Sequence, residues 1–344
     1  MMKHLCRLLA VLLVLAAVLG CAAAEEKPLD KKNYNKVMAY IKENQPMEFD
    51  MEQTKFSIKQ LKKLMAEMPE GSTFNFTIWY CNSWIDNQSE VLDLDKGKAK
   101  VTKDDLKWLI DHMPNVKEVY SFNHRELDNK IIVPMMEEYP EIKFNWLVTV
   151  SSKYRIRTDA TAFSTQKNAD DKPDLTEQHF ENLKYVPGLR ALDIGHNAVK
   201  DLSWIENLPE LRVLILADNN VKDISSLAKL QHLEYLELFM NDVTDLSPLA
   251  EVKALKELNV SMLDLEHMDL SVLDELELER FWCHRSKVSD EMKEKFIAAN
   301  PETQCSFHYG HSTSNGWREG YRYKQFRTMF KNRTWTDFVR PEEK

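Results

Sequence analysis

Five residues near the C-terminus are of the types that bind zinc: Cys283, His284, Cys305, His308 and His311. Neighbouring strand residues point to opposite faces, so we expect His284 to face away from Cys283 and His308 away from Cys305. Zinc needs its ligands within about 2.3 Å, which opposite strand faces do not allow. We therefore predict no metal site, and interpret the two cysteines as stacked, buried thiols that an oxidising compartment could join as a disulfide.

Other catalytic signatures are missing from the sequence. The chain has only eight glycines, which form no nucleotide-binding loop and no nucleophile elbow, and it has no His-Glu-x-x-His motif. Its carboxylate pairs fall where a solvated surface is the expected location, without the facing pair that glycoside hydrolysis needs. These features predict a non-enzymatic protein without cofactor or metal. A hydrolase within residues 55–188 is the less favoured alternative.

The N-terminus has the pattern of a targeting segment. Lys3 and Arg7 precede a short apolar stretch, residues 8–20, and Cys21 follows directly. The stretch Val-Leu-Gly-Cys resembles a bacterial lipobox, which implies a signal peptide over residues 1–20 and a lipid attached to Cys21. Ordinary cleavage after residues 22–24, all alanine, is the alternative. The expected location is therefore extracytoplasmic, anchored to the bacterial membrane by lipid, or secreted if Cys21 is not acylated.

A repeated pattern, Leu-x-x-Leu-x-Leu-x-x-Asn, dominates the C-terminal half. Its opening leucines recur every 22 or 23 residues, at Leu189, Leu211, Leu233, Leu255 and Leu278. Within one repeat, Leu214 and Leu216 point to one side of a strand and Ile215 to the other. Stacked repeats would share one core and form a parallel sheet. The asparagines are expected to form a ladder that stops at Leu263, and the recurring Asp-x-Ser triplets to cap turns on the convex side.

This pattern resembles the leucine-rich repeat family in its short, internalin-like bacterial form. The segment YRIRTDATAFST (154–165) and the Trp-Arg and Tyr-rich tail resemble parts of uncharacterised leucine-rich-repeat lipoproteins of Firmicutes. The resemblance implies an α/β solenoid, with a parallel concave sheet, degenerate β-α repeats N-terminally and a C-terminal cap. It implies almost nothing about the ligand.

Six prolines mark the ends of predicted helices just before predicted strands: Pro69, Pro114, Pro140, Pro187, Pro209 and Pro301. We therefore expect residues 55–188 to form degenerate strand–helix repeats of the same solenoid, with an independent α/β domain as the alternative. Residues 164–174 are the best loop candidate. The remaining predicted regions are a tether and N-terminal helical cap (21–54), the leucine-rich repeats (189–309) and a C-terminal cap (310–344) with apolar positions at Phe326, Met329 and Phe330.

Strand positions between the leucines should form the concave face and bind the ligand. They include aromatic, Met and Arg side chains, which are typical of interaction surfaces: Asp193, Ile215, Tyr235, Glu237, Phe239, Met240, Met262, Arg280, Trp282, His284 and Arg285. The alternative is that a loop or the C-terminal tail covers them. Five strands offer only about 400 Å² of face, so Trp79, Trp84, Tyr120 and Trp146 could also take part.

These features predict a cell-surface binding module for a protein, peptide or glycan. A self-associating envelope scaffold is the alternative. The net charge of −9 argues against nucleic acid, and the lipid on Cys21 is the only expected contact with the membrane.

Overall fold

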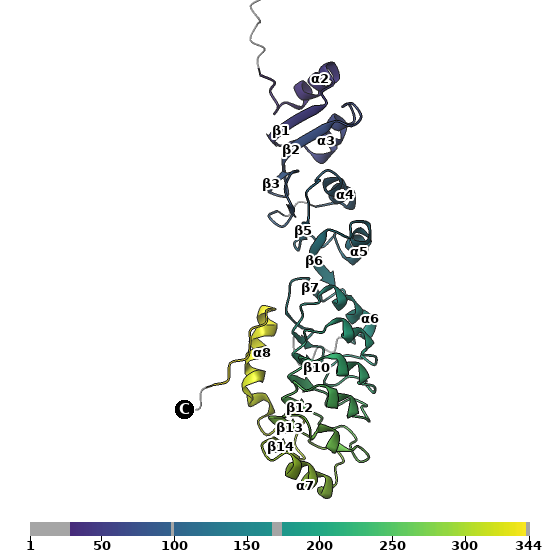
Figure 1. Cartoon of the computed structure of the whole chain (residues 1–344), viewed down its shortest axis with the longest axis vertical. Helices are drawn as coiled ribbons and strands as arrows, with labels where there is room; N and C mark the ends of the chain where they lie inside the picture. Colours follow the sequence, from purple (N-terminus) through teal and green to yellow (C-terminus); the bar gives the residue numbers. More distant parts are fainter. Residues whose placement is uncertain (1–27, 98–99, 167–173, 342–344) are drawn as a thin grey trace, which may run out of the picture. The chain divides into compact units, whose positions relative to one another are not determined.

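The structure, a computed structural model, describes residues 28–97, 100–166 and 174–341 (Figure 1). The predicted signal peptide, Cys21 and most of the predicted loop 164–174 lie outside these residues. The described chain forms two compact units, and the boundary between them falls among residues 93–117. It therefore lies inside the predicted segment 55–188.

The first unit pairs a small sheet with helices. Its elements are α2 (Tyr34–Asn44), β1 (Glu48–Thr54), α3 (Ile58–Met65), β2 (Thr73–Tyr80), β3 (Ser83–Asp86) and α4 (Lys103–Asp111). Strand β2 lies between β1, parallel to it, and β3, antiparallel to it. Inward residues alternate along the strands, and Phe76 of β2 stacks on Trp108 of α4 at 5.5 Å between ring centroids. Strand β4 (Val91–Asp93) follows at the unit boundary.

The second unit begins with another strand–helix–strand segment. Strand β5 (Glu118–Ser121) and β6 (Lys143–Thr149) are parallel and joined by α5 (Asn129–Glu138), and β7 (Arg155–Arg157) pairs antiparallel with β6. Pro69 and Pro140 lie between a helix and the next strand, as predicted, because proline cannot continue a helix.

The repeat sheet of the second unit has seven strands in the order β14-β13-β12-β11-β10-β9-β8. Neighbouring strands are parallel, and Leu192, Leu214, Leu236 and Leu258 lie side by side in register, all fully buried. The repeated leucines therefore share one core, as predicted. The strands are β8 (Ala162–Ser164), β9 (Ala191–Asp193), β10 (Val213–Ile215), β11 (Tyr235–Glu237), β12 (Glu257–Asn259), β13 (Arg280–Trp282) and β14 (Gln304–Ser306).

Short helical turns cover the convex side of this sheet. They are α6 (Glu177–Phe180), η1 (Glu181–Tyr185), η2 (Ser203–Asn207), η3 (Ser225–Lys229), η4 (Ser247–Glu251), η5 (Leu270–Leu273) and the longer α7 (Asp290–Ala299). The carboxylates of Asp201, Asp223, Asp245 and Asp269 each accept a hydrogen bond from the backbone N–H of the serine two residues later, at 2.8–2.9 Å. The predicted capping role of the Asp-x-Ser triplets is confirmed.

An asparagine ladder closes the turn after each strand. The side-chain amide of Asn219 donates to Leu216 O at 2.9 Å and to Ile194 O of the preceding repeat at 3.0 Å, and its oxygen accepts from the N–H of Val199. Asn197 and Asn241 make equivalent bonds. The ladder stops at Leu263, as predicted, and one repeat later Ser286 donates to Val260 O at 3.1 Å.

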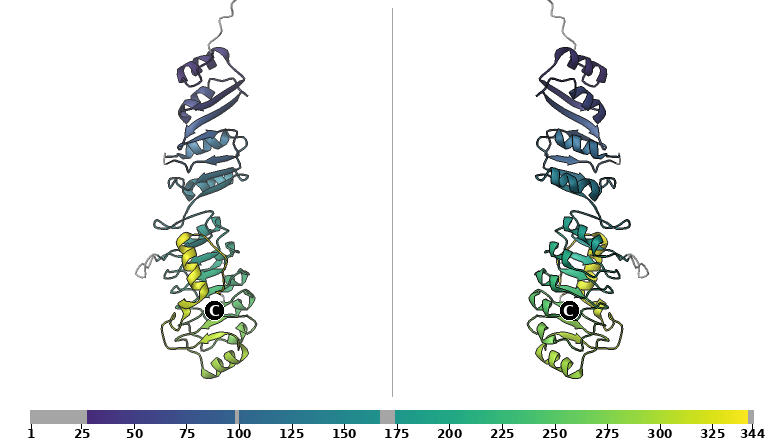
Figure 2. Two further views of the ribbon diagram at one scale, coloured as in Figure 1. Left: turned by 90° about the vertical axis from the view of Figure 1, so that its left-hand side faces the viewer. Right: turned by 90° about the vertical axis from the view of Figure 1, so that its right-hand side faces the viewer.

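The C-terminal segment, residues 316–338, lies against the concave side of the repeat sheet. It contains η6 (Trp317–Glu319) and α8 (Tyr321–Asn332), and α8 runs across the strands (Figure 2). At one end Arg280 of β13 donates to Trp317 O at 3.0 Å, and at the other the N–H of Trp335 donates to the hydroxyl of Thr161, beside β8. The prediction that this tail covers the open end of the solenoid is wrong: it ties the first strand of the sheet to the penultimate one.

Candidate functional site

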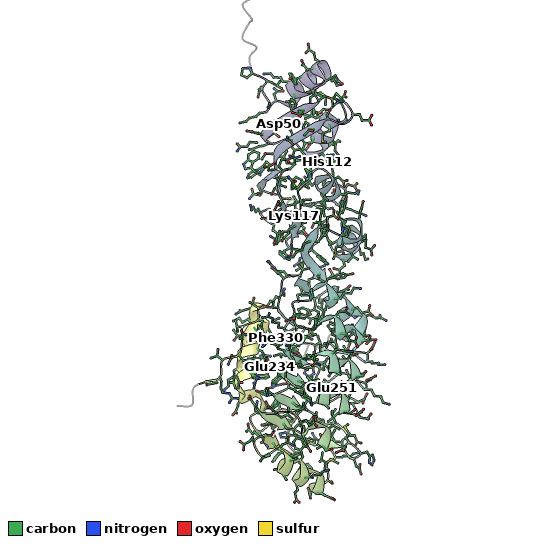
Figure 3. All side chains as sticks on the ribbon, in the orientation of Figure 1. Asp50, His112, Lys117, Glu234, Glu251 and Phe330 are labelled. Carbon is green, nitrogen blue, oxygen red and sulfur yellow. The ribbon has the colours of Figure 1, made fainter. Side chains whose placement is uncertain are left out.

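The predicted concave contact face exists, but the C-terminal segment covers most of it. Figure 3 shows Phe330 on α8 and Glu251 on the opposite, convex side of the repeats. Eight of the eleven predicted ligand-binding residues are at most 9% exposed, which corrects the expectation of a free face: Asp193, Ile215, Tyr235, Glu237, Phe239, Arg280, Trp282 and His284. These eight residues therefore fit the alternative interpretation of the sequence, in which the C-terminal tail covers the concave face.

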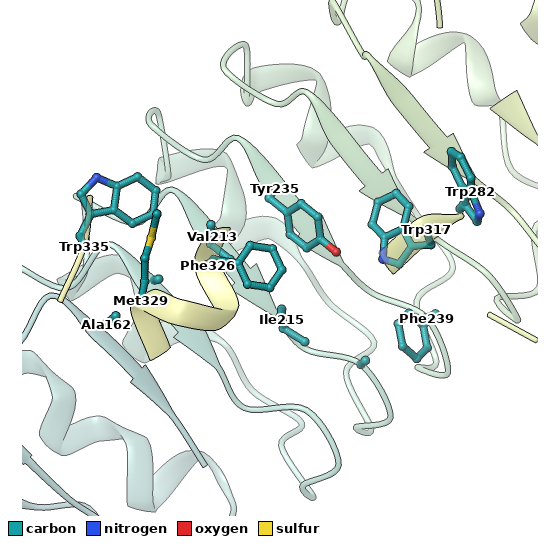
Figure 4. Close-up of a cluster of buried hydrophobic side chains, with 12 residues drawn as sticks. Ala162, Val213, Ile215, Tyr235, Phe239, Trp282, Trp317, Phe326, Met329 and Trp335 are labelled. Carbon is teal, nitrogen blue, oxygen red and sulfur yellow. The ribbon is translucent and has the colours of Figure 1, made fainter. Parts of the chain in front are cut away.

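Aromatic packing holds the segment in place (Figure 4). The ring of Tyr235 contacts Phe326 of α8 at 4.8 Å and Trp317 of η6 at 5.3 Å between centroids, and Trp282 contacts Trp317 at 5.3 Å. Met329 and Trp335 belong to the same buried cluster. A large apolar area is therefore removed from water, which makes this face part of the protein interior.

Buried carboxylates on the same face pair with basic side chains. Glu257, 0% exposed, lies 2.8 Å from Arg280 and 3.1 Å from Arg322 of α8. Glu237 accepts from Trp317 Nε1 at 2.6 Å and from the hydroxyl of Tyr235, and burial raises the pKa of Glu237 to about 7. Burial also raises the pKa of Asp193. The face thus recognises an aromatic, basic helix, and that helix belongs to the same chain.

The three predicted site residues that stay exposed lie together at the strand ends. Met240, Met262 and Arg285 occupy the same turn position in successive repeats, each in the left-handed backbone conformation with φ of 58°, 62° and 53°. His196 and Asp218 hold this position in the two preceding repeats, and their side chains are 2.7 Å apart. Met240 is 37% and Met262 36% exposed. Met240, Met262 and Arg285 therefore lie in a row along one edge of the sheet.

Tyr309 extends this row and was not predicted as a site residue. The N–H of Met262 donates to His284 O, just before Arg285, and the N–H of Arg285 donates to His308 O, just before Tyr309. The tyrosine is 88% exposed. The sequence signal is weak, because α7 lengthens the last repeat and shifts Tyr309 out of the 22-residue spacing. We call Met240, Met262, Arg285 and Tyr309 the strand-end ridge.

The Cys/His cluster does not form a metal site. Strand pairing sets Cys305 beside Phe281, so the expectation that Cys305 stacks on Cys283 is wrong by two residues. Both thiols are free, and burial raises the pKa of Cys283 to about 12 and of Cys305 to about 11, so both stay protonated at neutral pH. Across the described residues, no three His, Cys, Asp or Glu side chains are placed to hold a metal ion.

The aromatic candidates of the N-terminal half differ in accessibility. Trp79 and Trp84 face each other across the β2–β3 hairpin at 5.2 Å, each 40% exposed. Trp146 is buried, and Tyr120 is half-buried with its hydroxyl bonded to Glu118. Of these four candidates, the two hairpin tryptophans therefore offer the most aromatic surface. None of the described helices is both long and apolar enough to cross a membrane.

Comparison with known proteins places the repeats in a family. Residues 187–229 and 209–251 match the family model of leucine-rich repeats in two copies. The chain is similar to the crystal structures of two internalins from Listeria monocytogenes: internalin C2 (19% identity, 62% of this chain and 80% of that one, TM-score 0.33) and InlF (16%, 82% and 86%, 0.37). The functional domain of InlJ from the same organism is 13% identical over 80% of this chain and 55% of that one, with a TM-score of 0.34.

No curated protein matches the chain. The family match covers three consecutive strands of the repeat sheet, β9 to β11, and the parallel order of that sheet continues on both sides of the match. Residues 187–251 are therefore leucine-rich repeats, and the second unit contains an α/β solenoid with a parallel concave sheet, as predicted.

Proposed function

We propose that this protein is a non-enzymatic binding module whose contact surface is the strand-end ridge. The observation that carries this proposal is the exposure of Met240, Met262, Arg285 and Tyr309 in one row on a rigid sheet edge. Met, Arg and Tyr are enriched in protein interfaces, and flexible methionines adapt to apolar partners. Residues from adjacent repeats are about 4.8 Å apart, so the row is about 14 Å long. That length suits a peptide or a protein edge.

A protein or peptide partner is favoured over a glycan. The two methionines supply unbranched apolar side chains, which pack against apolar side chains of a partner. Arg285 adds a charge, and Tyr309 an amphipathic ring that retains its exposure at 88%. The ridge also lies outside the area covered by residues 316–338, so a partner need not displace the buried aromatic cluster.

Replacing Met240 and Met262 together by aspartate is expected to weaken partner binding at least tenfold while leaving the melting temperature within a few degrees of wild type. Asp218 already occupies the equivalent left-handed turn position, so aspartate is compatible with the fold there. Partners would be captured from surface extracts with the soluble chain, and their affinities measured by titration. Met47→Asp, at a 56% exposed methionine of the first unit, is the matched control.

The ridge would be the wrong surface if the double variant binds as tightly as wild type, or if Met47→Asp weakens binding equally. Light scattering separates the module from the alternative of an envelope scaffold. A monomer supports the binding module. A stable self-associated species of the same size in wild type and in the double variant supports a scaffold that pairs through another surface.

We further propose that the module is extracytoplasmic and anchored by a lipid on Cys21. Lys3, Arg7 and the apolar residues 8–20 before Cys21 support this. Cys21→Ala is expected to abolish incorporation of a labelled fatty acid and to release the protein from the membrane fraction, because no acylated N-terminal cysteine can form. Cys283→Ala, at a buried thiol, should keep the label. Unchanged labelling of Cys21→Ala would contradict the anchor.

A further inference from the structure

A cavity of about 340 Å³ lies at the end of the strand-end ridge, between Arg285 and Tyr309. Its size is within the range of small-molecule sites. Four of the lining residues carry basic or imidazole side chains, and none is a carboxylate. The complete lining consists of Cys283, Arg285, Ser286, Lys287, Val288, Lys293, Phe307, His308 and Tyr309. On a chain with a net charge of −9, this is a local concentration of positive charge.

The basic groups differ in how far they are neutralised. Lys287 is 2.8 Å from Asp264 and Lys293 is 2.9 Å from Asp290, so each has an acidic partner. Arg285 has no side-chain hydrogen bond or ion pair with any described residue, although its guanidinium carries five donors. An exposed, unpaired guanidinium beside a cavity is free to bind a planar oxyanion through two parallel hydrogen bonds.

His308 and Lys293 add donors to the same cavity. The N–H of Gly310 donates to His308 Nδ1 at 3.0 Å, so the neutral ring carries its proton on Nε2. The side chain of Lys293 is only 27% exposed, and Asp290 first, then Tyr309 and Cys283, raise the pKa of Lys293. The Lys293 ammonium therefore stays charged and lines the same cavity as Tyr309.

Apolar side chains form the rest of the wall. Val288 is buried, Phe307 is half-buried, and the ring of Tyr309 is exposed beside them. A fully hydrated inorganic ion would leave this apolar surface unused. A ligand with an apolar body and one oxyanion would bury the body against Phe307 and Val288 and direct the charge to Arg285.

We propose that this cavity binds an oxyanion carried on an apolar group, with Arg285 as the main recognition residue. The inference rests on the proposed function in one respect, since Arg285 and Tyr309 also belong to the ridge. It deepens that function: the partner docked along the ridge presents a carboxylate or a phosphate group at this end. The shared chemistry is the oxyanion, and the probes below distinguish its two sources.

Titration calorimetry of the full chain with benzoate, phenyl phosphate, benzamide and inorganic phosphate tests the cavity. Benzoate or phenyl phosphate is expected to bind at least tenfold more tightly than benzamide, which is neutral and of similar shape, and more tightly than inorganic phosphate. Preference for benzoate identifies a carboxylate source, and preference for phenyl phosphate identifies a phosphate source. Equal binding of benzamide and benzoate would overturn the proposal.

Arg285→Gln should reduce binding of the favoured probe about tenfold, with an unchanged melting temperature. Lys253→Gln removes the same charge from an exposed lysine that does not line the cavity, and should leave binding unchanged. Equal losses in the two variants would show a general charge effect and contradict the site. Met240→Asp alone, two repeats away from Arg285, should keep probe binding. If the Met240→Asp, Met262→Asp variant still captures the partner while wild type binds the probes, the ridge is the wrong surface and the cavity proposal stands. If no probe binds wild type, the cavity proposal is wrong and the ridge is not affected.

Discussion

Replacing Arg322 with alanine is expected to lower the free energy of unfolding by about 3 kcal/mol. The guanidinium lies between α8 and the sheet, 3.1 Å from Glu257 and 2.7 Å from Glu279, and the side chain is 6% exposed. Without it, the fully buried Glu257 keeps Arg280 but loses its second partner. Breaking a buried ion pair costs about 3–5 kcal/mol, and the remaining contact with Arg280 favours the lower end. Urea unfolding measures the change.

Arg340→Ala is the matched control, because Arg340 also contacts Glu279, at 2.6 Å, but is 66% exposed. Exposed ion pairs contribute at most about 1 kcal/mol, so this variant should be nearly as stable as wild type. Adding Glu257→Gln to Arg322→Ala should lower the stability further, because the largely buried Arg280 would then lose its carboxylate partner. Equal destabilisation by Arg322→Ala and Arg340→Ala would contradict the buried network.

The repeated core could be predicted from the sequence because its determinants are local. Each leucine lies in a fixed place within a 22-residue unit, and strand alternation alone decides that Leu214 points inward and Ile215 outward. The same holds for the Asn219 ladder and the Asp-x-Ser caps, whose bonds link a residue with its own or the next repeat. Periodicity therefore predicted both faces of the sheet correctly.

The cover on the concave face could not be predicted from periodicity, because its contacts join segments far apart in the chain. Trp317 donates to Glu237, 80 residues earlier, and Arg333 donates to Arg155 O, 178 residues earlier. A basic, aromatic helix has the same amphipathic pattern whether it covers an end or a face. The one available signal was complementarity: acids and aromatics on the face, and arginines and aromatics in the tail.

Irregular repeats account for the other differences. Strand β8 joins the repeat sheet although its residues, Ala162–Ser164, lack the leucine pattern, so the sheet starts before residue 189. The longer helix α7 lies between Phe281 and its strand partner Cys305, which are 24 residues apart. Cys305 and Tyr309 therefore lie two residues away from the positions that a 22-residue spacing predicts. Prediction by spacing fails where an insertion changes the period.

The covered face also explains why its polar residues resemble a binding site. An exposed ligand surface and a face that binds a segment of its own chain need the same aromatic anchors and charged partners. Burial distinguishes them: Trp282 is 1% exposed, whereas Tyr309, outside the cover, is 88% exposed. For this reason we propose the ridge along the strand ends as the contact surface, whereas the acids beneath α8 belong to the protein interior.

Glu237→Gln is expected to change how stability depends on pH. Burial raises the pKa of Glu237 in the folded protein to about 7, above its ordinary value of 4.5. Below about pH 4.5 the carboxyl is protonated in both states and contributes no penalty. Between 4.5 and 7 the unfolded chain loses the proton while the folded chain keeps it, so wild-type stability falls as pH rises, by about 3 kcal/mol in all, and then levels off.

Glutamine cannot ionise, yet its carbonyl oxygen can still accept from Trp317 Nε1 and the hydroxyl of Tyr235. The stability of wild type minus that of Glu237→Gln should therefore decrease by about 3 kcal/mol from pH 4 to pH 8 in urea unfolding. Because Asp193 is present in both proteins, its own raised pKa largely cancels in this difference. Glu251→Gln, at an exposed carboxylate on the convex side, should follow wild type at every pH. Parallel curves for wild type and Glu237→Gln would show that Glu237 has the same pKa in the folded and unfolded chain, so that the hydrogen bonds from Trp317 and Tyr235 offset the cost of burying its charge.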